Sequence, residues 1–113
     1  MLSYADPIME NIMAGLNSND YAKFSRDMSE EMKAKIGSEA FGELSGNLRV
    51  VIGKYASKTG SDVDWIGEYY RAVYTAEFTE DPSVTVILSF NRTDESHLVH
   101  GLWFNSKKLS GTN

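Results

Sequence analysis

The sequence predicts an α+β fold in which N-terminal helices pack on one face of a curved antiparallel sheet of three to four strands. Before residue 49 the apolar residues recur at intervals of three and four, which is the period of an amphipathic helix. From Tyr69 onward apolar and polar residues alternate, which is the period of a strand with one buried face. A group of helices followed by a group of strands is typical of the α+β class.

The chain of 113 residues has the length of one domain, and no Pro-, Gly- or Ser-rich linker divides it. We predict a single domain over residues 1–105. Residues 106–113 carry Lys107, Lys108 and Gly111 without any apolar period. This segment is therefore predicted to be a flexible C-terminal tail.

Composition excludes several classes of function. The chain has no cysteine, which rules out disulfides, iron–sulfur clusters, thiolate zinc sites and a cysteine nucleophile. Its net charge of −5 argues against binding to nucleic acid or to an anionic membrane, because both attract clustered cations. The N-terminus lacks the basic start and apolar run of a signal peptide, and no apolar stretch is long enough to span a membrane. For these residues alone we expect a soluble cytoplasmic protein without a cofactor.

The first helix is predicted to begin at Asp6 and to end near residues 15–17. Asp6 followed by Pro7 has the composition of an N-cap and a first helical position. An apolar stripe follows at helical spacing and comprises Ile8, Met9, Ile12, Met13 and Leu16. This stripe predicts one buried helix face.

Three shorter helices are predicted between residues 20 and 48, with N-caps at Asp20, Ser29 and Ser38. Their apolar residues again follow helical spacing: Tyr21, Phe24, Met28, Met32, Ile36, Phe41, Leu44 and Leu48. The methionines of the helical half fall at the same spacing. We therefore interpret them as core residues and not as a soft-metal site.

Alternation places residues 69–78, 84–90 and 97–104 in three strands, joined by polar turns at 80–83 and 91–96. A further strand is expected between residues 50 and 65, where Gly53 and Gly60 interrupt the pattern. Consecutive strands joined by short turns predict an antiparallel meander.

Three residues on the predicted inner face of the sheet carry polar groups, namely Tyr70, Tyr74 and His100. They are our candidates for a ligand pocket between the helices and the sheet.

The predicted outer face carries Val73, Ile87, Val99 and Trp103, which together are too apolar for a fully wet surface. We therefore predict a homodimer that forms through this face.

The order of elements resembles the small uncharacterised prokaryotic domains of the cystatin-like, nuclear-transport-factor-two-like superfamily. The resemblance rests on the helix at 6–16, the segment 16–24, the Glu30-Glu31-Met32 motif and the closing strand at 101–104. It implies a curved sheet that wraps around the helices as a cone with a pocket at its open end, and often a dimer through the sheet. It does not imply a reaction, because the superfamily includes isomerases, dehydratases and binding modules alike.

Our main hypothesis is a non-enzymatic binding or assembly module with a pocket for a small hydrophobic ligand. The predicted inner face is mostly apolar and lacks an acid–base pair. The alternative is a small isomerase or lyase in which His100 moves a proton and Tyr74 donates a hydrogen bond to an oxyanion.

Two other sites are less favoured. His97 and His100 lie three apart, which places them on opposite faces of a strand, so they do not form a metal site. An aromatic ligand platform is the alternative interpretation of Trp65 and Trp103, with Tyr69 nearby. Core or dimer packing is the preferred interpretation of both tryptophans.

Overall fold

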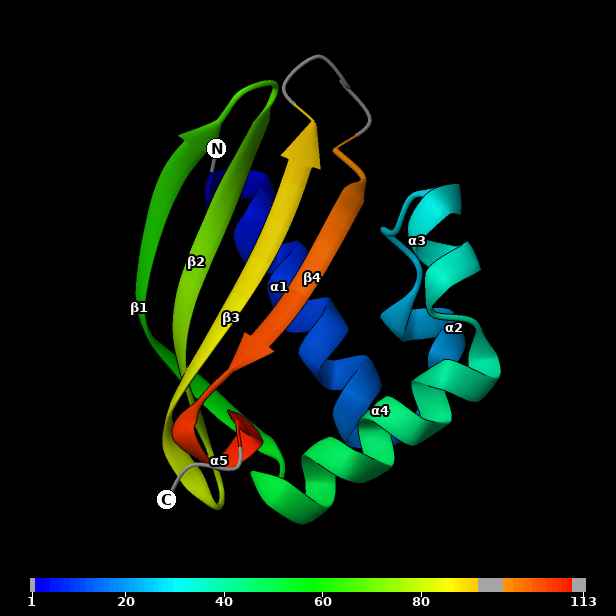
Figure 1. The fold of residues 1–113 in the computed structure, drawn as a ribbon, viewed down its shortest axis with the longest axis vertical. Coiled ribbons are helices and arrows are strands. Elements are labelled where there is room, and N and C mark those ends of the chain that lie inside the picture. Colours follow the sequence, from blue (N-terminus) through cyan, green and yellow to red (C-terminus); the bar gives the residue numbers. More distant parts are fainter. Residues whose placement is uncertain (1, 92–96, 111–113) are drawn as a thin grey trace.

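Four antiparallel strands form one sheet in the order β1-β2-β3-β4, and helices cover one of its faces (Figure 1). The computed structural model describes residues 2–91 and 97–110. Its elements are α1 (Leu2–Ser18), α2 (Tyr21–Phe24), α3 (Glu30–Lys35), α4 (Ser38–Val51), β1 (Tyr55–Ile66), β2 (Tyr69–Phe78), β3 (Asp81–Asn91), β4 (Val99–Asn105) and α5 (Lys107–Ser110). The predicted α+β class with an antiparallel meander is confirmed.

The core lies between α1 and the inner face of the sheet. The whole predicted stripe of α1 is buried, and the side chains of Met9, Ile12 and Met13 have no exposed surface. The inner positions of β2 and β3 are also buried: Tyr70, Ala72, Tyr74, Ala76, Phe78, Val84, Val86, Leu88 and Phe90. Full burial of one such large apolar side chain stabilises the fold by roughly 1.5–3 kcal/mol. Burial in this one core therefore explains both patterns, the period of two in the strands and the period of three to four in α1.

Helix α1 begins earlier than predicted. It starts at Leu2, and Pro7 lies inside it, so Asp6 is not an N-cap. Pro7 is the sixth residue of α1, so it removes one helical N–H bond and sets its ring against the preceding turn. The carboxylate of Asp6 instead accepts a hydrogen bond from the hydroxyl of Tyr74 on the sheet, at 2.7 Å.

Two of the three N-caps predicted for the shorter helices are confirmed. The side chain of Asp20 accepts from the N–H of Lys23 at 3.2 Å, and that of Ser29 accepts from the N–H of Met32 at 3.2 Å. The cap predicted at Ser38 is wrong by one residue, because α4 begins there and its N-cap is Gly37.

The segment between α2 and α3 ties the helices to the edge of the sheet. Met28 forms a parallel bridge with Val99 of β4. The N–H of Val99 donates to the carbonyl of Asp27 at 2.7 Å, and the N–H of Ser29 donates to the carbonyl of Val99 at 3.0 Å. These bonds fill one end of an edge that β4 would otherwise leave unpaired.

A β-bulge in β4 overturns two predicted face assignments. Ser89 pairs with Gly101, but its neighbour Phe90 pairs with Val99, so one extra residue, His100, is inserted into β4. Val99 therefore lies in the core with no exposed surface, and its predicted place on the outer face is wrong. Val99, and not His100, occupies the inner position opposite Phe90. The extra residue reverses the alternation beyond it, so uninterrupted counting assigns the wrong face.

The other edge strand, β1, lies within the region expected for a further strand except for its last residue, Ile66, and has two irregularities in its pairing with β2, at residues 55–57 and 58–60. Gly53 precedes it with a φ of 84°, a left-handed conformation that favours glycine. An added Cβ at Gly53 would lie only 2.0 Å from the Thr79 hydroxyl oxygen. This glycine therefore marks the turn from α4 into β1, and Gly60 lies at a bulge within the strand.

The C-terminal segment contains more structure than predicted. Residues 107–110 form α5, in which the N–H of Leu109 donates to the hydroxyl of Ser106 at 3.1 Å. Leu109 packs against the core. The rest of the predicted tail, residues 111–113, lies outside the described residues.

We predict opposite effects of alanine at two helical glycines. In Gly15→Ala the new Cβ would lie 2.6 Å from the backbone nitrogen of Phe24, so α1 and α2 must separate, at a cost of about 1–3 kcal/mol in unfolding free energy. Gly46 on the exposed side of α4 has no atom within 4 Å of the same position, so Gly46→Ala stabilises by about 0.5–1 kcal/mol. Urea unfolding measures both changes. Equal effects of the two substitutions would contradict close packing of α1 on α2.

Candidate functional site

An apolar cavity of about 550 Å³ opens beside β4, and we call it the α4–β4 cavity. It is lined by Ile36, Leu44, Asn47, Leu48, Val51, Leu102, Trp103, Phe104 and Leu109. Asn47 is the one residue of polar type among them, and the others are aliphatic or aromatic. The cavity has the size and the lining of sites that bind small apolar molecules.

Helical and strand periodicities together build this cavity. Leu44, Leu48 and Val51 recur at spacings of three and four, so they lie on one side of α4. Leu102 and Phe104 alternate with Trp103 along β4 and pair with Leu88 and Val86 of the inner face. The short helix α5 adds Leu109 at the far end of the cavity. These residues thus follow from helix and strand periodicity, whereas Trp103 lines the cavity although it pairs with Ile87 of the outer face.

A smaller cavity of about 170 Å³ lies further along β4, and we call it the α3–β4 cavity. Its lining comprises Met32, Lys35, Ile36, His100, Gly101, Leu102 and Trp103. Ile36, Leu102 and Trp103 border both cavities, so the two adjoin along the strand. Together they place basic side chains at one end of an apolar space.

The three predicted pocket residues do not come together. Tyr70 packs in an aromatic cluster, with its ring centroid 5.8 Å from that of Phe90 and 5.2 Å from that of Trp65. Tyr74 is fully buried, and its hydroxyl is already bonded to Asp6. Neither tyrosine lines either of the cavities along β4; of the three predicted residues only His100 lines one of them, the α3–β4 cavity.

His100 lies at the edge of the sheet and faces acidic and aromatic neighbours. Its Nδ1 lies 3.9 Å from a carboxylate oxygen of Glu31, whose side chain is 82% exposed. Its ring meets that of Tyr69 edge to face, with centroids 6.3 Å apart. The imidazole thus lies beside the α3–β4 cavity. Tyr74, the oxyanion donor predicted to act with it, does not line that cavity.

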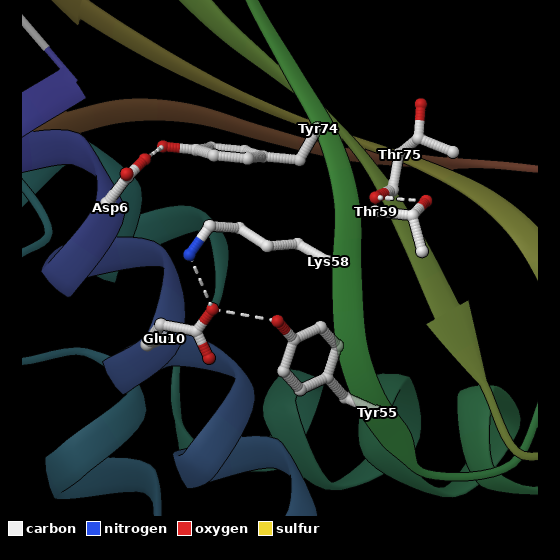
Figure 2. A network of polar contacts seen from close by, with 7 residues as sticks. All are labelled: Asp6, Glu10, Tyr55, Lys58, Thr59, Tyr74 and Thr75. Atoms are coloured by element: carbon white, nitrogen blue, oxygen red, sulfur yellow. Dashed lines mark hydrogen bonds and ion pairs between the residues drawn. The ribbon is translucent and has the colours of Figure 1, made fainter.

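A polar network fixes α1 to the first two strands (Figure 2). Besides the bond from Tyr74 to Asp6, Glu10 accepts from the hydroxyl of Tyr55 at 2.8 Å and from the ammonium of Lys58 at 3.1 Å. Asp6 and Glu10 are one helical turn apart, so both face the sheet. The network supplies partners for hydroxyl groups that the core would otherwise leave unsatisfied.

Burial and these carboxylates raise the pKa values of Tyr55 and Tyr74. Burial raises the pKa of Tyr74, and the hydrogen bond and negative charge of Asp6 raise it further. Burial likewise raises the pKa of Tyr55, followed by its hydrogen bond to Glu10 and the charge of that residue. Both phenols therefore stay protonated well beyond their ordinary range, which suits structural donors better than proton carriers.

Sequence reasoning missed the partners of these tyrosines and most of the cavity lining. Asp6 and Glu10 flank the apolar stripe of α1 at a spacing of four, and that spacing is the signal that could have revealed them. Helical spacing predicts Leu44 and Leu48 as apolar positions of a helix. It does not predict the space that separates these side chains from β4.

The outer face carries three of the four predicted dimer residues. Val73 pairs with Ile87, and Ile87 pairs with Trp103, so the three form one row across the sheet. The indole of Trp103 lies over Gly101, where an added Cβ would be 2.3 Å from the ring, and it remains 51% exposed. A third cavity of about 330 Å³ borders this row and includes Arg71.

Trp65 does not share this face. It pairs with Tyr70 on the helix side of β1, at the opposite edge of the sheet from β4. The aromatic platform of Trp65 and Trp103 considered from the sequence is therefore wrong.

No family model, curated protein or solved structure matches this chain. Across residues 2–91 and 97–110, no group of three or more histidine, cysteine, aspartate or glutamate side chains could hold a metal ion. Within the same described part, no helix is long and apolar enough to cross a membrane.

We predict that Tyr74→Phe weakens the loss of stability in alkali. Because the pKa of Tyr74 in the folded state lies above the ordinary value of 10.0, the folded protein keeps a proton that the unfolded chain loses above that pH. Stability from this group is complete below pH 10 and falls above it by up to about 1.4 kcal/mol per pH unit.

Urea unfolding between pH 8 and pH 11 measures the effect. Tyr74→Phe should lower stability by about 1 kcal/mol at neutral pH, because Asp6 loses a donor, yet show a shallower decline in alkali. The same decline in variant and wild type would contradict the buried Tyr74–Asp6 bond.

Proposed function

We propose that the protein is a non-enzymatic binding module that holds a small apolar ligand in the α4–β4 cavity. The apolar lining of that cavity, about 550 Å³ in volume, is the observation that carries the proposal. Transfer of an aliphatic chain from water into such a space is favourable by about 0.8 kcal/mol for each CH₂ group buried. The location differs from the Tyr70, Tyr74 and His100 set, but the type of ligand is the one expected from the sequence.

The alternative, an isomerase or lyase that uses His100 and Tyr74, has less support. Its two groups would need to reach one substrate. Tyr74 lies on the inner face of β2, bonded to Asp6, while His100 lies at the β4 edge beside Glu31.

Membership of the cystatin-like, nuclear-transport-factor-two-like superfamily remains our proposal, and the meander packed over α1 is in keeping with it.

Two neighbouring valines of α4 provide the test of ligand binding. Val51 lines the cavity, whereas Val50 is 84% exposed and does not. Val51→Phe should therefore fill part of the cavity and weaken binding of decanol about tenfold, a loss of roughly 1.4 kcal/mol, whereas Val50→Phe should leave it unchanged.

The fluorescence of Trp103, which lines the cavity, reports binding in a Trp65→Phe background. Decanol that fails to perturb this signal, or that binds Val51→Phe as well as the parent, would contradict the proposed site.

We also propose that two copies associate through the outer face of the sheet. Support comes from the row of Val73, Ile87 and Trp103, in which a large part of the indole is exposed. The same face carries Asp62 and the ion pair of Arg71 with Asp64, whose Nη2 and Oδ2 lie 2.6 Å apart, and charges of both signs suit a self-complementary two-fold contact.

Ile87→Asp should convert a wild-type dimer into a folded monomer, because a carboxylate in the middle of the apolar row cannot be desolvated without a partner. Val50→Asp, on the exposed side of α4, is the control and should remain dimeric. Sedimentation equilibrium distinguishes the states, and circular dichroism checks folding. A monomeric wild type, or a dimeric Ile87→Asp, would exclude this interface.

A further inference from the structure

We propose that the ligand of the α4–β4 cavity is an aliphatic monocarboxylate whose carboxylate binds Lys35 in the adjoining α3–β4 cavity. This proposal rests on the binding function proposed above and specifies the chemical class of the ligand. It follows from the different linings of the two cavities: the larger is mainly apolar, and the smaller includes basic side chains.

The two cavities adjoin along β4 and differ in their lining. Ile36, Leu102 and Trp103 line both of them and thus form their common boundary. The larger end is apolar apart from Asn47, and the smaller end contains Lys35 and His100. A ligand that fills both ends must combine an aliphatic chain with a polar head.

The charges at the smaller end favour a negative head. Lys35 closes α3, and no ion pair of its ammonium is found among residues 2–91 and 97–110. Lys33, two residues earlier, instead lies 3.8 Å from a carboxylate oxygen of Glu30. An ammonium beside an apolar space, in a chain whose net charge is −5, is available to a carboxylate from outside.

The same charges disfavour the other classes of amphiphile. Among the described residues that line the two cavities none is acidic, so a cationic head would have no counter-charge there. A carboxylate oxygen of Glu31 lies 3.9 Å from Nδ1 of His100. Its side chain is 82% exposed, so solvent and salt screen its repulsion of a carboxylate at Lys35.

A neutral alcohol of the same length would bury the same chain but gain no charged hydrogen bond. The structure thus predicts a difference in affinity between two ligands that differ only in the head group. The two tryptophans make this difference measurable: Trp103 borders both cavities, and Trp65 lies on β1 at the other edge of the sheet.

The experiment titrates decanoate and decanol, below their micelle concentrations, into the Trp65→Phe protein and follows the fluorescence of Trp103. Decanoate should bind about threefold more tightly than decanol, as expected for an ion pair with the exposed, solvent-screened ammonium of Lys35. Lys35→Gln should remove that advantage and leave decanol unchanged, and Lys35→Arg should restore it. Lys33→Gln, the matched control on the same helix, should bind both ligands like the parent.

The outcomes separate the two proposals. Decanol that binds as tightly as decanoate, or a decanoate affinity that Lys35→Gln does not lower, would overturn the carboxylate class while the apolar site stands. If neither compound binds, the proposed function itself is wrong, and the inference fails with it.

Discussion

The parallel pairing of residues 27–29 with Val99 is the interaction on which the rest of the arrangement depends. It joins the helical half of the chain to β4, which is an edge strand and would otherwise present free backbone groups. Beyond that pairing α3 leads away from β4 and α4 returns toward α5, as Figure 1 shows, and these elements surround the space beside the strand. The two cavities lie in that space, bordered on the strand side by residues 100–104. A β-bulge next to the pairing turns Val99 into the core and leaves His100 at the rim.

The opposite side of the domain is held in a different way. There α1 is bound to β1 and β2 by polar groups at its margin, from Asp6 to Tyr74 and from Glu10 to Tyr55 and Lys58 (Figure 2). These bonds satisfy hydroxyl groups that burial would otherwise leave without partners. One side of the sheet is thus closed by hydrogen bonds and packing, and the side along β4 is only partly closed. A ligand site at β4 therefore needs no rearrangement of the core.

The sequence predicts what local periodicity determines. Strand β2 and its buried face follow from alternation alone, and the stripe of α1 follows from helical spacing. The bulge at His100 has no such signal, because an inserted residue shows only when β4 is paired with β3. For the same reason uninterrupted alternation predicts Val99 on the outer face and groups His100 with Tyr74. The cavity is still less accessible from sequence, since it depends on how far α4 lies from β4 and not on which residues are apolar.

The central claim is that an aliphatic chain occupies the space between α4, β4 and α5. Intermolecular nuclear Overhauser effects between decanoate and the methyl groups of the protein test it most directly. The account predicts contacts from the ligand chain to Leu44, Val51, Leu102 and Leu109, which line that space. Contacts confined to Ile87 and Val73 on the outer face of the sheet, with none to the leucines of α4 and α5, would contradict it.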